Sequence, residues 1–222
     1  MAMATVTRAL EKNTWLVYGG LLVLLSTLLV LSPAEATLGN IVKIVYAHGA
    51  AQRVALYAYL IAGGLGIVSL SLRAFEKQSP TANAEIASQK TLAMTERWSR
   101  ALMESAIAFW LIQFVVSLPA QILAWGAITW SEPRVVSALW ILVFTALVYI
   151  VALWIGDARW TSIAAIANAA IALILLRGAA NILHPIDPIL GSDSLAIKGF
   201  YLAIVLTIGA LAFQFARDRA RA

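Results

Sequence analysis

Six apolar stretches close to membrane-span length constrain the fold of this sequence more than any other feature. A helix needs about 20 mostly apolar residues to cross the hydrocarbon core of a bilayer. We expect spans at approximately 15–32, 47–71, 101–120, 135–154, 161–178 and 196–215. Of the 222 residues, 62% are hydrophobic and 12% are charged, so a single water-facing globule could not bury this apolar surface. The sequence therefore predicts an all-α, polytopic membrane protein, with residues 1–222 forming one domain of six transmembrane helices.

The distribution of basic residues predicts the orientation of this bundle. If the N-terminus is cytoplasmic, the inner segments contain Arg8, Lys12, Arg73, Lys77, Lys90, Arg97, Arg100, Arg159, Arg217, Arg219 and Arg221. The outer segments and span edges then contain Lys43, Arg53, Arg134, Arg177 and Lys198. Basic residues concentrate in cytoplasmic loops of membrane proteins, so we expect both termini to be cytoplasmic. The longest connection, 72–100, then lies inside, and we expect its C-terminal part to be helical.

The chain contains only two histidines, and this orientation places both at the outer face. His48 lies in "IVYAHGAAQRV" at the outer entrance to the second span, and His184 lies in "NILHPIDPIL" between the fifth and sixth spans. A lone histidine at a membrane edge is most often an idle interfacial residue. Two histidines on one face instead suit haem iron, which accepts two imidazole ligands, whereas zinc usually takes three or more protein ligands. Asp187 keeps another kind of metal site open as an alternative.

A tryptophan-bearing segment, "AWGAITWSEPR", joins the third and fourth spans on the same outer face. Tryptophan is enriched at membrane interfaces, so these rings could simply be anchors. They could also form an aromatic shelf for a porphyrin, with a glycine allowing close approach and arginines available to the porphyrin's carboxylates. The residues that this second interpretation selects are Trp125, Gly126, Trp130, Arg134 and Arg53.

Other features of the sequence narrow the chemistry. The chain has no cysteine, which excludes disulfides, thiolate metal sites, iron–sulfur clusters and covalent thioether attachment of haem. Glu104 and Gln113 lie within the third span, where polar groups are often functional. The small residues of "AGGLG", Ala62 to Gly66, and the pair Gly19 and Gly20 predict close helix packing. The net charge of +5 is not concentrated in one dense patch, so we expect no nucleic-acid partner.

Three segments together resemble a known family. "KIVYAHGAA" is similar to its first-histidine segment, "WGAITWSEPR" to its tryptophan-rich (WWD) loop, and "ILHP" to its second-histidine segment. The family is that of the haem-handling membrane proteins of cytochrome c biogenesis, the CcmC/CcsA superfamily, and the likeness is greatest to the six-span CcmC type. The tryptophan-rich loop is thinner here than in the family, and Glu132 stands where the family has an aspartate.

The resemblance implies a haem-binding protein of the bacterial cytoplasmic (inner) membrane, with its site on the periplasmic side. Haem b would be held non-covalently, with His48 and His184 as axial ligands to the iron. Trp125, Gly126, Trp130 and Arg134 would form the platform of the site. The protein would present or export haem for cytochrome c maturation, with a periplasmic haem chaperone and an ABC transporter as partners. Such a protein delivers haem and is not an enzyme.

Two other functions fit the sequence. A b-type cytochrome subunit that exchanges electrons with quinol would also use histidine-ligated haem, although such subunits often carry more histidines. A haem-free structural subunit of a larger membrane complex would explain the thinned tryptophan loop, but it would give no reason for two histidines at matching positions.

Overall fold

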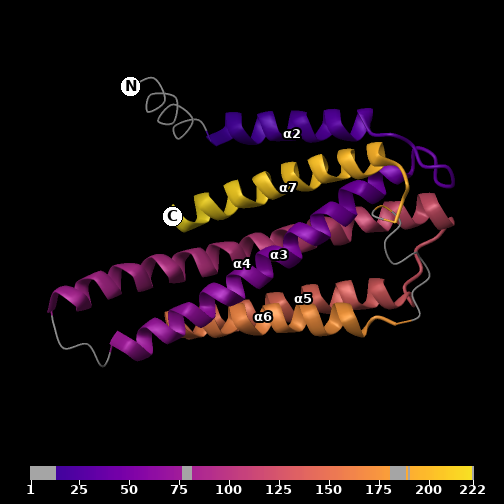
Figure 1. Ribbon diagram of the computed structural model, residues 1–222. Coiled ribbons are helices and arrows are strands. Elements are labelled where there is room, and N and C mark those ends of the chain that lie inside the picture. The colour runs from indigo at the N-terminus through magenta and orange to yellow at the C-terminus, as the bar shows by residue number, and fades with distance from the viewer. Residues whose placement is uncertain (1–13, 77–81, 181–188, 190, 222) are drawn as a thin grey trace, which may run out of the picture.

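The computed structural model describes residues 14–76, 82–180, 189 and 191–221, and the secondary-structure elements in these residues are six α-helices. They are α2 (Thr14–Leu31), α3 (Val42–Glu76), α4 (Ala82–Trp125), α5 (Pro133–Ile155), α6 (Ala158–Gly178) and α7 (Leu195–Arg221). Consecutive helices run in opposite directions, and together they form one elongated bundle (Figure 1). The predicted all-α architecture is confirmed.

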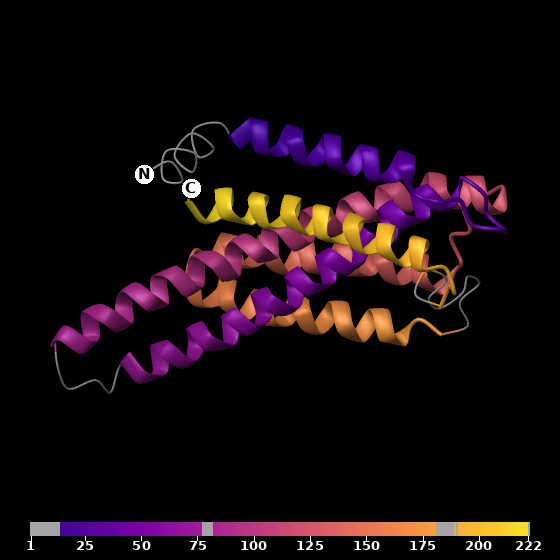
Figure 2. The same cartoon turned by 45° about the horizontal axis from the view of Figure 1, so that its top comes forward.

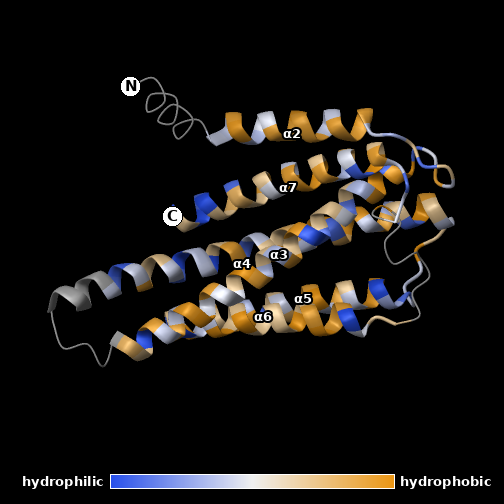
Figure 3. Ribbon diagram, in the orientation of Figure 1, coloured by the Kyte–Doolittle hydropathy of each residue, from blue (hydrophilic) through white to orange (hydrophobic). Residues whose placement is uncertain are grey.

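Each of the six helices is long and apolar enough to cross a membrane. Hydrophobic residues cover the middle of the bundle, and hydrophilic residues gather toward the helix ends and the connections (Figure 3). Large apolar side chains also face outward; Trp154, for example, is 88% exposed. Exposure of an apolar surface of this extent to water would be unfavourable, whereas lipid solvates it well. The chain is therefore a multi-pass membrane protein with the six predicted spans.

The length of α4 differs from the sequence-based prediction. The sequence predicts a span at 101–120 after a long polar connection, whereas α4 begins at Ala82 and continues without a break to Trp125. At 1.5 Å per residue its 44 residues extend about 66 Å, roughly twice the thickness of a hydrocarbon core. Its first half runs beside the end of α3, beyond the other helices (Figures 1 and 2). The Ala, Glu, Gln and Lys residues of 82–100 are good helix formers, so nothing in that segment ends the helix.

The two ends of the bundle carry different parts of the chain (Figure 1). One end, called the terminal end below, has the start of α2, the end of α7 and the connections α3–α4 and α5–α6. The other, called the loop end, has the connections α2–α3, α4–α5 and α6–α7. α2 lies at the edge of the bundle against α7, and none of its residues is buried. Of the segments singled out in the sequence, the two around His48 and Trp125 belong to the loop end, whereas nearly all of the third, around His184, lies outside the described residues.

Small residues allow α3 and α6 to approach closely. A Cβ atom added at Gly66 would lie 2.6 Å from the carbonyl oxygen of Ser162, and one at Gly63 would lie 2.8 Å from Cβ of Ala169. The predicted packing role of "AGGLG" is therefore confirmed. The same prediction is wrong for Gly19 and Gly20, because no described atom lies within 4 Å of a Cβ added at either position.

Polar contacts inside the bundle join helices that are distant in sequence. The hydroxyls of Tyr59 on α3 and Thr145 on α5 are 2.9 Å apart, and the Asn168 amide on α6 donates to the Thr145 carbonyl at 3.0 Å. Each such bond satisfies polar groups that would be costly to leave without a partner in the apolar interior. These contacts help to fix the relative positions of α3, α5 and α6.

A charged cluster joins three helices toward the terminal end. Glu104 on α4 is partly buried, with 9% of its side chain exposed, and accepts hydrogen bonds from Arg100 on the same helix, Tyr149 on α5 and Arg219 on α7. Three donors therefore surround one carboxylate, which is the arrangement that makes a buried charge tolerable. The polar residue expected within the third span thus has a structural role.

Candidate functional site

A cavity of about 650 Å³ opens among the helices at the loop end. This volume is within the roughly 300–1,000 Å³ typical of sites that hold small molecules or cofactors. Its walls come from α3, the second half of α4, the starts of α5 and α7, the end of α6 and the two flanking connections. Residues that are far apart in the sequence therefore meet around one space.

Helical spacing explains which residues α3 and α4 contribute. The α3 wall repeats every three or four residues and consists of Val42, Val45, Tyr46, His48, Gly49, Gln52, Arg53 and Leu56. The α4 wall has the same period and consists of Gln113, Ser117, Ala120, Gln121, Ala124 and Trp125. Residues at this spacing lie on one face of a helix. Each helix thus presents a continuous face to the cavity.

His48 lies in the second turn of α3, is half-buried, and lines the cavity. Tyr201 of α7 packs beside it, and a Cβ atom added at the neighbouring Gly49 would lie 3.4 Å from the Tyr201 hydroxyl. Tyr201 is only 3% exposed, so the cavity has a well-packed wall on this side. The structure therefore places an imidazole at a partly enclosed site, where it is able to act as a ligand.

Two arginines line the same cavity. The guanidinium carbon of Arg53 lies 5.3 Å from the ring centroid of Tyr201, within the range of a cation–π interaction. Arg134 is the second residue of α5 and also faces the cavity. Lys43, by contrast, donates to the carbonyl oxygen of Val30 at 2.7 Å and thereby satisfies the C-terminal end of α2. The lining of the cavity thus combines two guanidinium groups with an imidazole.

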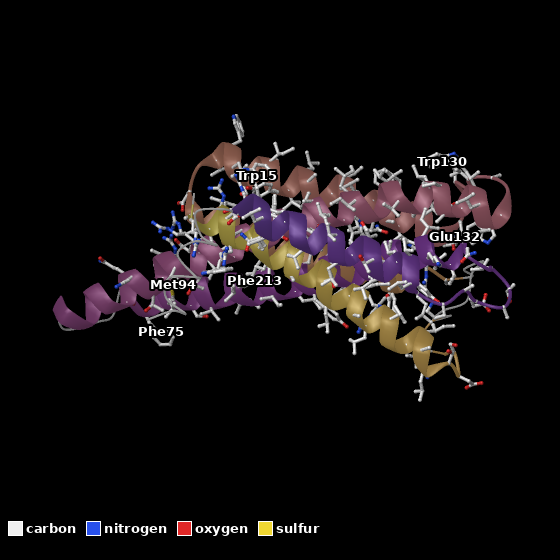
Figure 4. All side chains as sticks on the ribbon, turned by 90° about the horizontal axis from the view of Figure 1, so that it is seen from above. Trp15, Phe75, Met94, Trp130, Glu132 and Phe213 are labelled. Atoms are coloured by element: carbon white, nitrogen blue, oxygen red, sulfur yellow. The ribbon has the colours of Figure 1, made fainter. Side chains whose placement is uncertain are left out.

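Only part of the tryptophan-bearing segment contributes to the cavity. Trp125, the last residue of α4, lines the cavity. Gly126 adopts a φ of +79° and its N–H donates to the Ile122 carbonyl, so it ends the helix and is not among the lining residues. Trp130 is 57% exposed at the loop end and does not line the cavity either (Figure 4). One of the two predicted shelf tryptophans therefore belongs to the site.

Glu132 has a structural role in addition to its place at the cavity. It is 1% exposed, and its carboxylate accepts a hydrogen bond from the Val135 N–H at 2.9 Å, which caps the start of α5. Pro133 follows it at the first helical position, where a missing N–H costs nothing. The Glu-Pro pair directly before an apolar run is the sequence signal that indicates this helix cap.

The connection between α2 and α3 adds a further anionic group. Glu35 lines the cavity, and its carboxylate accepts hydrogen bonds from the backbone N–H groups of Thr37 and Leu38, both at 2.9 Å. These bonds, led by that from Leu38, hold the pKa of Glu35 below its usual value. Glu35 is therefore negatively charged at neutral pH.

The structure thus assembles four of the seven residues selected from the sequence, namely His48, Arg53, Trp125 and Arg134. His184 lies outside the described residues, as does Asp187; the described residues Leu176 and Ile189, on either side of that segment, both line the cavity. Sequence reasoning missed Tyr46, Tyr201 and Glu35, which have no recognisable motif. It marked Gln113 only as a polar residue within a span.

Comparison with known proteins adds no family assignment: no protein-family model matches the chain, and no curated protein gives a significant match.

Proposed function

We propose that this chain is a haem-binding integral membrane protein that holds haem b through His48 and His184. It presents or exports the haem at the outer membrane face for cytochrome c maturation. The observation that carries the proposal is that His48, Arg53, Arg134 and Trp125 line one and the same cavity. These residues come from three helices and were selected from the sequence for the same chemistry.

The residues around the cavity fit haem in three respects. If bound, haem would supply an iron that accepts imidazole ligands, and it would bring a flat apolar ring with two carboxylates. His48 provides one imidazole for the iron. Apolar side chains such as Val45, Leu56 and Val135 offer walls for a ring. Arg53 and Arg134 offer guanidinium groups, which pair well with carboxylates.

The proposed mechanism needs only reversible contacts. His184 completes the ligation in this proposal, and its described neighbour Ile189 supports it because it lines the cavity. The chain has no cysteine, so it forms no thioether bond to haem, and release requires only exchange of the imidazole ligands. An acceptor such as a periplasmic haem chaperone would supply the competing ligand, and an ABC transporter would be the membrane partner.

The proposal also assigns sides. We place the loop end at the periplasmic face of a bacterial inner membrane and the terminal end in the cytoplasm. Basic residues support this orientation because the terminal end carries Arg73, Arg97, Arg100, Arg159, Arg217, Arg219 and Arg221. Cytoplasmic segments of membrane proteins have this excess.

Haem loading of the purified protein tests the proposal. The protein is expressed with haem supply, purified in mild detergent, and its haem content is determined with visible spectra of the oxidised and reduced forms. We expect about one haem per chain with a six-coordinate b-type spectrum, weakened in both His48→Ala and His184→Ala. Tyr57→Ala is the matched control, because Tyr57 is on α3 with 56% exposure and does not line the cavity. A wild-type protein that stays colourless would sink the proposal and favour a haem-free structural subunit.

A further inference from the structure

The amide of Gln113 is buried in the wall of the cavity with an unused hydrogen-bond donor. The residue is 3% exposed, and its Nε2 atom has no hydrogen-bond partner among the described residues. Other polar side chains on the same face of α4 are satisfied. Ser117 donates to the Phe114 carbonyl at 2.7 Å, and the Gln121 side chain accepts from the Thr129 N–H at 3.2 Å. Gln113 therefore differs from its neighbours along the helix.

A donor in this position is unfavourable for the empty protein. A buried polar group without a partner loses its bonds to water and gains nothing in return. Such groups are rare, and each calls for an explanation, of which a bound ligand is one. Since Gln113 lines the cavity, the occupant of the cavity is the partner available to it.

Arg53 lies about as far from the loop end of the bundle as Gln113 does. It is 11 residues, or about 17 Å, along α3 from Val42 at the loop end. Gln113 is 12 residues, or about 18 Å, along α4 from Trp125 at the same end. Both line the cavity, so its deeper part has a guanidinium group and an amide donor.

The charged groups nearer the loop end differ in sign. The lining carboxylates, Glu35 in the α2–α3 connection and Glu132 at the start of α5, both lie there, together with Arg134. His48 lies between the two parts, two turns from the loop end of α3. At the loop end an anionic group of a ligand meets two carboxylates beside the single guanidinium of Arg134, whereas in the deeper part it meets the Arg53 guanidinium and the Gln113 amide without a lining carboxylate.

We propose that Gln113 and Arg53 together bind a carboxylate of the cavity's ligand, so that the ligand enters with its acidic edge toward the interior of the bundle. The inference rests on the proposed function in that the ligand is a porphyrin, whose only peripheral hydrogen-bond acceptors are its two carboxylates. Gln113 is then a recognition residue, and it fixes the direction in which the ring is inserted.

Metal-free porphyrins test this recognition without involving the iron ligands. The protein in detergent is titrated with protoporphyrin, which has two carboxylates, and with octaethylporphyrin, which has none. Binding is followed by quenching of tryptophan fluorescence, since Trp125 lines the cavity. Gln113→Met keeps the side-chain volume and removes the donor. The matched control is Gln214→Met, at a buried glutamine outside the cavity that bonds to Asp218.

We expect wild type to prefer protoporphyrin. Gln113→Met should bind it about 10- to 100-fold more weakly, the amount that a hydrogen bond to a charged group contributes. Its affinity for octaethylporphyrin should be unchanged, and its melting temperature equal to or above that of wild type, because the substitution removes a buried donor without a partner. Gln214→Met should leave the affinity for both porphyrins as in wild type.

Equal weakening for both porphyrins, no weakening, or a lowered melting temperature with no change in preference would show that Gln113 is structural, and would overturn the inference. A wild type without preference for protoporphyrin would do the same. The two proposals fail separately. A wild type that shows no six-coordinate iron spectrum contradicts haem ligation, whereas the response of metal-free porphyrin binding to Gln113→Met does not depend on the iron.

Discussion

The Arg53 guanidinium on α3 lies over the ring of Tyr201 on α7, with 5.3 Å between its central carbon and the ring centroid. Both residues line the cavity at the loop end. A cation over an aromatic face keeps its charge while part of its hydration shell is removed. The contact therefore holds a positive charge at the cavity wall and joins two helices at the same time.

Removal of the Tyr201 ring should weaken both effects. We expect Tyr201→Leu to lower the free energy of unfolding by about 1–3 kcal/mol, through lost packing and the lost cation–π contact. It should also loosen haem binding several-fold, because Arg53 loses the surface that positions it. Tyr201→Phe keeps the ring, so the difference between the two variants reports the ring alone. Identical unfolding and haem titrations for both variants would contradict this role.

The cluster around Glu104 should be important for stability at the terminal end. Glu104→Leu leaves Tyr149, Arg100 and Arg219 without their shared acceptor. Both arginines are about half exposed, so the expected loss is modest for a buried pair, about 1–3 kcal/mol in unfolding from mixed micelles. Asp157→Asn breaks an exposed ion pair with Arg159 and serves as the control that should leave the midpoint unchanged. A Glu104→Leu protein as stable as the control would show that the cluster is incidental.

The close approach of α3 and α6 predicts a contrast between neighbouring glycines. Gly66→Ala should destabilise by about 1–3 kcal/mol, because its new Cβ would lie 2.6 Å from a backbone oxygen that cannot move alone. Gly64→Ala meets no described atom within 4 Å and should be neutral or slightly stabilising, since alanine is the better helix former. Thermal unfolding of the two variants side by side gives the comparison. Equal effects would mean that the helices are less tightly packed than the structure shows.

The Glu35 carboxylate predicts acid sensitivity of the α2–α3 connection. Hydrogen bonds from the N–H groups of Leu38 and Thr37 lower the pKa of Glu35 below its usual 4.5. A carboxyl whose pKa is lower in the folded state stabilises that state above the unfolded pKa, and the contribution is lost as pH falls through the folded pKa. The protection factors for amide exchange at positions 37 and 38, corrected for the intrinsic pH dependence of exchange, should therefore be high at neutral pH and fall as the pH drops through the lowered pKa of Glu35. In Glu35→Gln the protection should no longer depend on pH, and a wild-type-like acid transition in that variant would contradict the assignment.

The sequence predicted the helices well and the site in part, for physical reasons that particular residues illustrate. Long apolar runs specify membrane spans almost by themselves, because the bilayer sets their length. A helix in the C-terminal part of 72–100 was predicted, but its start at Ala82 and its continuity with the span were not, because a polar helix outside the apolar run has no hydropathy signal. His48, Arg53, Trp125 and Arg134 could be selected because their residue types are rare in such a chain and their chemistry is specific.

Other parts of the cavity depend on packing that the sequence does not display. Tyr201 and Gln113 reach it because α7 and α4 cross α3 at particular heights, and no local pattern specifies those heights. Trp130 illustrates the opposite error. Its residue type and place in the segment suggested a platform, but the turn begun by Gly126 leaves it exposed at the loop end.

The proposed binding of haem iron by His48 in this cavity can be tested by low-temperature electron paramagnetic resonance of the ferric protein. We predict a low-spin signal for wild type, conversion to high spin in His48→Ala, and recovery of the low-spin signal when imidazole is added to that variant. A His48→Ala protein that retains the wild-type low-spin signal without imidazole would contradict the claim.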